Sequence, residues 1–255
     1  MKRINCVIYA FLLLSQAVLF AADAKTVLPR LTAAEIVDKN IAARGGLQSW
    51  HAVQAIRMKG KLEAGGNANP ELPFVLEMKR PRKVRMELQF NGQTAVQVYD
   101  GANGWKVRPF LNRHEVEPFN AEEIKTASAQ SELDGPLVDY AAKGNKVEFD
   151  GVDQVEGRDT YRLKVTLKNG QTQHLWIDSQ TFLEAKMQGS PRRMNGQYHA
   201  VETYFRDYKR VEGLIIPHLL ETRVAGVKGT KPEKITIASV LLNPKLDEAQ
   251  FTKPK

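Results

Sequence analysis

Apolar and polar residues alternate along most of the segment from residue 74 to residue 109. Turn signals interrupt this alternation at Lys79-Arg80-Pro81, Asn91-Gly92 and Asp100-Gly101. A period of two places every second side chain on the same face of a strand, so the segment predicts a curved antiparallel sheet with one apolar face. The apolar residues assigned to that face are Phe74, Leu76, Met78, Val84, Met86, Leu88, Phe90, Val96 and Val98.

Strand character also dominates the second half of the chain. Strands are predicted over residues 56–62, 146–150, 161–167, 173–178, 182–188, 202–209, 214–223 and 234–242, with hairpin turns at Asn169-Gly170 and Glu212-Gly213. With the first segment they predict an antiparallel meander of about 10–11 strands. A doubly wound parallel sheet would need helices between the strands, and the pattern does not show them. The apolar face must be covered by a second sheet, a helix, barrel closure or a ligand.

A helix is predicted ahead of the first strand. Thr32 and Glu35 have the spacing of a capping box, and Ile36, Val37 and Ile41 form an apolar stripe. Gly45-Gly46 supplies a stop, which gives a helix of about a dozen residues.

A second helical region interrupts the strands. Asn120 and Glu123 can cap a helix that runs through Leu133, and Asp134-Gly135-Pro136 can begin a short helix over residues 137–142. Two helices inserted between strands predict a lid over about residues 120–142. Its apolar residues are Ile124, Leu133, Leu137 and Tyr140.

The first residues resemble an export signal. Lys2 and Arg3 precede an apolar run over residues 7–20, which is shorter than a comfortable membrane span, and Ala22-Asp23-Ala24 provides small residues for cleavage after Ala24. An uncleaved anchor is the alternative. Cleavage would leave residues 25–255 as one domain in the periplasm. The single cysteine, Cys6, lies inside the signal, which excludes disulfides, thiol catalysis and thiolate metal ligands from the mature chain.

The chain is basic, with a formal net charge of +8. Nucleic acid is not expected as a partner of an exported protein. The anions left are phospholipid head groups, lipopolysaccharide phosphates and acidic protein surfaces, and a solvated surface without a specific partner is the alternative.

The search for catalytic chemistry gives no candidate. The five histidines are scattered and have no metal-ligand spacing on a predicted helix. No serine lies in a Gly-x-Ser-x-Gly elbow, and the glycine pairs lack the lysine and helix of a phosphate loop. We therefore expect no enzyme, no metal and no cofactor.

The order of these features resembles a known family. The features that carry the resemblance are the export signal, the N-terminal helix, Lys79-Arg80-Pro81 at a strand end, Asp100-Gly101 before Trp105, and Asn243-Pro244 near the end. With these features in this order, the chain is similar to the LolA/LolB-type lipoprotein carriers and the outer-membrane lipoprotein-sorting proteins. The resemblance implies a mainly β fold, an unclosed antiparallel β-barrel with a helical lid, whose concave apolar surface receives acyl chains.

The resemblance also gives Arg80 a role, as a latch that donates hydrogen bonds to lid carbonyls. Arg80 continues the inward phase of Leu76 and Met78, and its planar group can donate several bonds. The alternative is a side chain that reaches out to solvent beside Arg82 and Lys83. Leu163, Val165 and Trp176 complete the predicted acyl-chain cavity. Plain core packing is the alternative for every apolar residue named.

The expected function is that of a monomeric periplasmic carrier, which binds acyl chains of lipoproteins or free lipid and ferries them toward the outer membrane. Its partners would be an inner-membrane transporter and an outer-membrane acceptor. An envelope sensor built on the same half-barrel, or an enzyme acting on lipid or glycan, is the alternative. The chain is longer than a typical LolA, with extra loops near residues 189–198 and 226–232, which leaves the cargo open.

Overall fold

The computed structural model describes residues 28–65, 70–189, 191–194, 197–226 and 231–254. The predicted cleavage after Ala24 lies outside these residues, as do parts of the two extra loops. None of the helices in the described ranges has the length and hydropathy that a membrane crossing requires.

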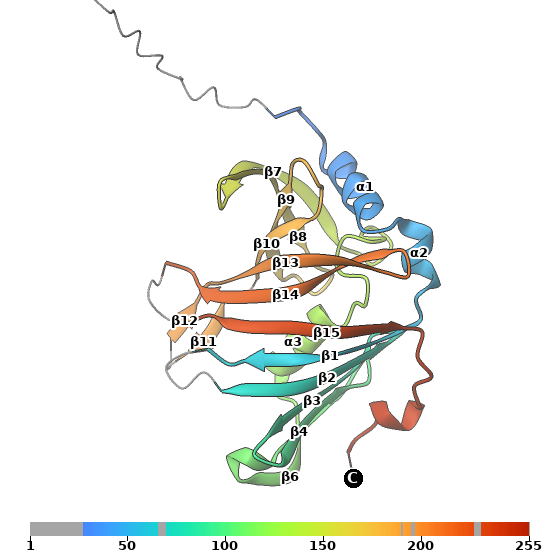
Figure 1. The fold of residues 1–255 in the computed structure, drawn as a ribbon, viewed down its shortest axis with the longest axis vertical. Helices are drawn as coiled ribbons and strands as arrows, with labels where there is room; N and C mark the ends of the chain where they lie inside the picture. The colour runs from blue at the N-terminus through green and yellow to red at the C-terminus, as the bar shows by residue number, and fades with distance from the viewer. Residues whose placement is uncertain (1–27, 66–69, 190, 195–196, 227–230, 255) are drawn as a thin grey trace, which may run out of the picture.

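One large antiparallel sheet forms the body of the molecule (Figure 1). Its thirteen strands follow the order β6-β5-β4-β3-β2-β1-β15-β14-β13-β10-β9-β8-β7, so β6 and β7 are its two edges and the sheet does not close. The strands are β1 (Ala55–Glu63), β2 (Glu71–Lys79), β3 (Lys83–Phe90), β4 (Gln93–Tyr99), β5 (Gly104–Arg108), β6 (Arg113–Pro118), β7 (Lys146–Val155), β8 (Arg158–Thr166), β9 (Thr172–Asp178), β10 (Glu184–Gln188), β13 (Val201–Val211), β14 (Leu214–Val224) and β15 (Glu233–Leu242). The predicted unclosed antiparallel sheet is confirmed.

The sheet has more strands than the sequence pattern indicated. The edge strand β6 was not predicted, because its residues are mostly polar and an edge strand with an exposed surface needs no apolar alternation. A separate two-stranded ribbon, β11 (Arg192–Met194) with β12 (Gln197–His199), adds two short strands.

The N-terminal helix forms as predicted. The first helix, α1 (Ala33–Ala43), begins at Thr32, whose hydroxyl accepts from the backbone of Glu35 while the Glu35 carboxylate accepts in return. Its stripe buries Ile36 and Val37 completely. The helix ends with its C-cap at Arg44, directly before Gly45-Gly46 as predicted, and a separate short helix, α2 (Leu47–Ala52), follows. Two short 3₁₀ turns are η1 (Pro109–Leu111) and η2 (Glu248–Phe251).

The predicted lid is only partly helical. The helix α3 (Ala121–Gln130) begins with the predicted capping box of Asn120 and Glu123, but it ends before Leu133. The prediction of a second lid helix over residues 137–142 is wrong, because the chain forms turns there. Gly135 and Asp139 have φ angles of 80° and 50°, which a right-handed helix cannot contain. We call residues 131–144 the wedge.

The register of the strands defines two faces of the sheet. Met58, Leu76 and Met86 are successive Cα partners across β1, β2 and β3, and they share the face toward α3 and the wedge, which we call the inner face. Arg57, Glu77 and Arg85 form the neighbouring row on the outer face. The C-terminal segment crosses this outer face, where Leu246 and Phe251 pack on Ala55.

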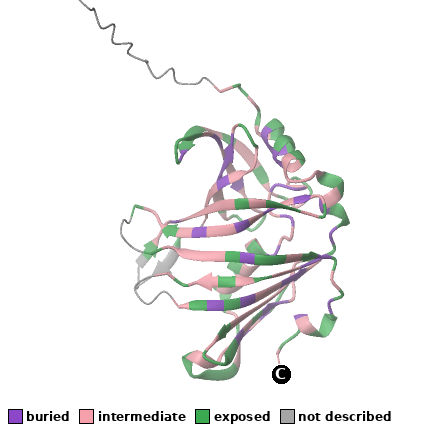
Figure 2. Cartoon of the chain, viewed as in Figure 1, coloured by how far each residue is buried: buried purple, intermediate pink, exposed green. Residues whose placement is uncertain are grey.

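Two core clusters fill much of the inner face. The first joins Ile36 and Val37 of α1 to β8 and β9, and the second joins Trp50 of α2 to the strands around β14, β15 and β1. The wedge serves both, since Leu137 belongs to the first cluster and Val138 to the second, and neither is exposed. Figure 2 shows the contrast with β1, β2 and β15, where half-buried and exposed stretches separate the few buried residues.

Candidate functional site

The inner face of β2 and β3 carries apolar side chains that the core does not fully cover. Leu76, Met86, Leu88 and Phe90 are half-buried there, and the inner-face Gln97 of the next strand is exposed. Phe90 meets Phe110 edge-on, with 5.9 Å between ring centroids. We call this region, from Met58 to Gln97, the open half of the inner face.

The helix α3 lies over the open half without filling it. It is drawn behind β15 and β1 in Figure 1, on the inner side of the sheet. None of its residues is buried, and Ile124, its only large aliphatic side chain, is half-buried. A helix with a single aliphatic side chain buries less of an apolar sheet face than an apolar helix does.

Two residues assigned to the inner face are on the outer face. Val96 pairs with Glu87 and Val98 pairs with Arg85, so both valines point away from Met86 and Leu88. The reason is the two-residue turn Asn91-Gly92, which pairs Phe90 with Gln93 and places odd-numbered residues of β4 beside even-numbered residues of β3. The assignment of Val96 and Val98 to the cavity is therefore wrong.

The three cavity residues predicted in the other half of the sheet do not lie on the open half. Leu163 and Val165 are fully buried in the cluster under α1, where they pack as core. Trp176 pairs with Arg162 and lies on the outer face. Its indole donates to Asp153 at 3.1 Å, and the Lys186 ammonium lies 3.9 Å from its ring centroid. The prediction that Trp176 faces the cavity is wrong.

The remaining predicted residues divide between core and open surface. Phe74 is buried, and its ring crosses the backbone at Gly60, where a Cβ would lie 3.0 Å from the ring. Met78 belongs to the second core cluster, and Leu76, Val84 and the wedge residue Leu133 pack against that cluster. Tyr140 packs against the first cluster.

Arg80 is held at the junction of the sheet, α2 and the wedge. It donates to the carbonyl oxygens of Val53 at 2.8 Å and Trp50 at 3.2 Å, and to the Asp134 carboxylate at 2.7 Å. The Asp134 side chain is 1% exposed and also bonds to Lys143. Burial by itself would raise the pKa of Asp134, but the bonds from Lys143 and Arg80 outweigh it and hold the pKa below its usual value. Arg80 thus contacts the predicted lid at Asp134, through a carboxylate and not a backbone carbonyl.

Arg82 makes the contact to a backbone carbonyl of α3. Its guanidinium donates to the carbonyl and the hydroxyl of Ser128, both at 2.6 Å, and to the hydroxyl of Ser131 at 3.2 Å. It also lies 3.2 Å from the Glu132 carboxylate. The turn brings Arg82 to α3 through a left-handed backbone, with φ of 67°. The only sequence signal for this contact is the basic turn itself.

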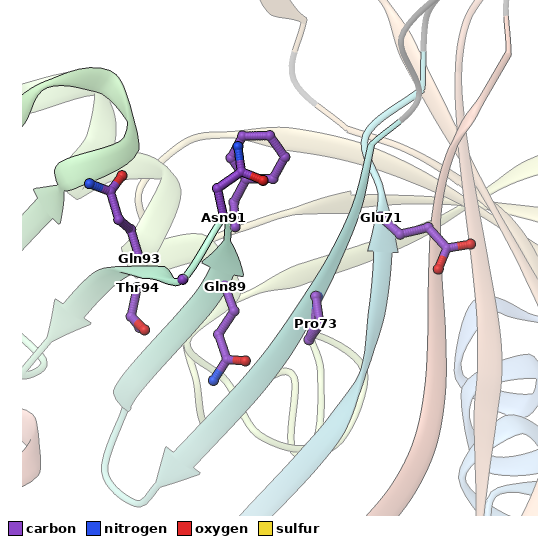
Figure 3. Close-up of a pocket in the computed structure, with 8 residues that line it drawn as sticks. Glu71, Pro73, Gln89, Asn91, Gln93 and Thr94 are labelled. Atoms are coloured by element: carbon purple, nitrogen blue, oxygen red, sulfur yellow. The ribbon is translucent and has the colours of Figure 1, made fainter.

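The hollows on the surface have a different character. One, of about 480 Å³, lies at the hairpin between β3 and β4 (Figure 3), where the labelled side chains of Gln89, Asn91 and Gln93 spread apart and do not point to one centre. Another, of about 390 Å³, lies where β10 and β13 diverge and is lined by charged residues. In the described ranges, no three His, Cys, Asp or Glu side chains gather in a group that could hold a metal ion.

An open β half-barrel with a polar helix over a partly bare apolar face is the architecture that these observations define. Solved structures share the fold. A LolA superfamily protein from Nitrosomonas europaea superposes with a TM-score of 0.57 at 13% identity, covering 88% of this chain and 99% of that chain. An outer membrane lipoprotein-sorting protein domain from Vibrio parahaemolyticus gives 0.56 at 13%, covering 86% and 95%.

A third structure, a DUF1329 family protein from Desulfovibrio piger, has a TM-score of 0.56 at 14% identity and covers 86% of this chain and 97% of that chain. No protein-family model and no curated protein matches the sequence. The chain therefore has the LolA-like fold, which confirms the resemblance found in the sequence.

Proposed function

We propose that this protein is a periplasmic carrier that binds acyl chains of lipoproteins or lipids in the open half of its inner face. The observation that carries the proposal is the row of half-buried apolar side chains beneath a helix that buries none of its own residues. The LolA-like fold supports it, because lipoprotein sorting is the description of one of the similar structures.

The binding energy would come from removing the acyl chain from water. Each buried methylene contributes about 0.8 kcal/mol, so one long chain can offset the cost of ordering the ligand and the lid. Met86, Leu88 and Phe90 would contact the chain directly, and Phe74 with Met58 would form the floor.

The two arginines of the turn would have separate tasks. Arg80 fixes the wedge through buried Asp134, which holds the core in place. Arg82 holds the last turn of α3 through the partly exposed contact with Ser128, and it also bonds to Ser131 at the start of the wedge. Lid opening would therefore move α3 and leave the wedge in place.

The proposed function also requires export of the chain to the periplasm. The signal over residues 1–24 would deliver the chain to the periplasm, between a donor at the inner membrane and an acceptor at the outer membrane. Fractionation of cells that produce the full chain tests this step, since the mature protein should be released with the periplasm and should begin at Lys25.

Lipid analysis tests the binding itself. The protein, purified without detergent from a bacterium with two membranes, is extracted and its lipids are measured by mass spectrometry. Leu88→Asp places a carboxylate on the inner face and should reduce bound acylated lipid by about tenfold or more. Val96→Asp is the matched control, because it places the same group on the outer face of the neighbouring strand. Absence of acylated lipid from the wild-type protein, together with failure to bind a lipidated peptide, would overturn the carrier proposal.

A further inference from the structure

A buried lysine lies at the border of the open half. Lys106 of β5 is 7% exposed, and it is the Cα partner of Gln97, which in turn is the partner of Met86. One row across the inner face therefore changes from the apolar Met58, Leu76 and Met86 through Gln97 to a cation. Such a gradient matches an amphiphile with a charged head.

The lysine is neutralised by the lid. Its ammonium bonds to the carboxylate of Glu123 in the first turn of α3. Burial would raise the pKa of Glu123, but the bond from Lys106, with the backbone of Asn120 and the charge of Arg108, holds the pKa below its usual value. The pair thus fixes the start of α3 to the sheet, as Arg82 fixes its end.

Arg108 adds a second cation beside the first. The β5–β6 register is irregular between the two residues, but the Arg108 guanidinium reaches the side chain of Glu117, the Cα partner of Lys106, and so lies on the same inner face. Its terminal nitrogen donates to Glu117 at 2.8 Å, while its Nε is buried and has no hydrogen-bond partner. The Glu117 carboxylate also lies 3.6 Å from the Arg113 guanidinium, so three bases face the two acids Glu117 and Glu123. A buried donor without a partner is costly, and an incoming anion would satisfy it.

Movement of the lid would increase the excess of positive charge at this site. When α3 leaves the sheet, Glu123 leaves Lys106, and a buried ammonium without a counter-ion is strongly unfavourable. A phosphate on the cargo can take the place of the carboxylate, since charge-assisted bonds from lysine and arginine to phosphate are strong.

We propose that Lys106 and Arg108 bind the phosphate of an anionic lipid whose acyl chain lies along Met86 and Leu76, and that this phosphate displaces Glu123. Anionic cargo and lid opening are then coupled, because the same cations hold either the lid or the head group. The inference rests on the proposed acyl-chain binding, whose site it extends, and it names the chemical class of the cargo.

Calorimetry with single-chain amphiphiles below their micelle concentrations tests the proposal. Wild-type protein should bind dodecyl phosphate about tenfold more tightly than dodecyl maltoside, which has the same chain and no charge. Lys106→Met should remove this preference, so that the two amphiphiles bind with about equal affinity. Lys61→Met is the matched control, because Lys61 is an exposed lysine on the outer face of β1 and should leave the preference intact.

A second variant separates competition from a structural role. Glu123→Gln removes the internal competitor, so it should tighten dodecyl phosphate binding several-fold and increase the preference for dodecyl phosphate over dodecyl maltoside. The double variant Lys106→Met/Glu123→Gln removes both charges of the pair. It replaces Lys106→Met in the binding experiment if Lys106→Met alone does not fold. Hydrogen exchange of the α3 amides should accelerate when dodecyl phosphate binds to the wild type.

The outcomes distinguish the two proposals. Equal affinity of the wild type for both amphiphiles, or a preference that survives Lys106→Met, would overturn the head-group site while acyl-chain binding stands. Binding of inorganic phosphate as tightly as dodecyl phosphate would show a site for free phosphate and would also overturn it. Failure of both amphiphiles to bind would overturn the carrier function and this inference together.

Discussion

The two halves of the sheet are built from the same alternating pattern, but their inner faces differ. Under α1, the side chains of Leu163 and Val165 are completely buried, whereas under α3 the side chains of Met86 and Leu88 are only half-buried. The strands do not explain this difference. The helices above them do, because the cover decides whether an apolar face becomes core or a binding surface.

The two helices begin alike and then diverge. Both start with a capping box, at Thr32 for α1 and at Asn120 for α3. After that start, α1 presents Ile36 and Val37 to the sheet, while α3 presents Ile124 among alanine, serine and charged residues. Tertiary packing on an apolar stripe supplies most of the stability of a short helix, so α3 is the element that can move.

The wedge serves both halves, and removing its buried charge should have the largest effect. Asp134→Ala leaves Arg80 and Lys143 without their carboxylate, and breaking a buried pair costs about 3–5 kcal/mol. Urea unfolding followed by circular dichroism measures the loss. Asp38→Ala, on the exposed side of α1, is the control and should unfold like the wild type. A loss no larger than that of the control would mean that the wedge does not join the halves.

The comparison between the halves is tested directly by removing one leucine from each. Leu163→Ala opens a cavity in a closed core and should cost about 2–5 kcal/mol in the free energy of unfolding. Leu88→Ala removes a half-buried side chain and should cost about 1 kcal/mol. The same urea experiment measures both, on lipid-free protein. Equal losses would show that the open half is packed as tightly as the filled half.

Acid should weaken the wedge in a defined direction. The pKa of Asp134 is lowered in the folded protein, so its ionised form contributes stability above the ordinary carboxyl pKa of about 3.9, and this contribution is lost as the pH falls through the folded value. Asp134→Asn should therefore lose stability less steeply than the wild type below about pH 4. Asp38→Asn should follow the wild-type profile, and a parallel profile for Asp134→Asn would contradict the argument.

The sequence predicted local structure well, because local structure depends on neighbouring residues. A few adjacent residues are enough to predict both capping boxes. The same holds for the hairpin turns at Asn91-Gly92, Asn169-Gly170 and Glu212-Gly213. The position of Val96 could also have been predicted, since a two-residue turn fixes which side chains share a face. The prediction was wrong because it assigned even-numbered residues to the inner face on both sides of that turn.

The site was harder to predict, because it depends on contacts far apart in the chain. Nothing near Leu163 indicates that α1 covers it, so core and cavity residues have the same local pattern. The contacts of Arg80 to the wedge and of Arg82 to α3 depend on a left-handed residue and on partners more than forty positions away in the chain. The hydrophobic periods of two and 3.6 residues predict strands and helices, but they do not predict which distant segments pack together.

The smallest effect is expected at the end of the lid, where Arg82 holds Ser128. Arg82→Ala should lower the global free energy of unfolding much less than Asp134→Ala, because the Arg82 side chain is partly exposed, although it also removes a bond to the buried Ser131 hydroxyl. Hydrogen exchange of the amides at the C-terminal end of α3 should become about two- to fivefold faster, while exchange in α1 stays the same. Arg80→Leu is the contrasting variant, since it should lower global stability through Asp134. If Arg82→Ala instead destabilised the whole protein, α3 would be part of the core, and the distinction between a filled half and an open half would fail.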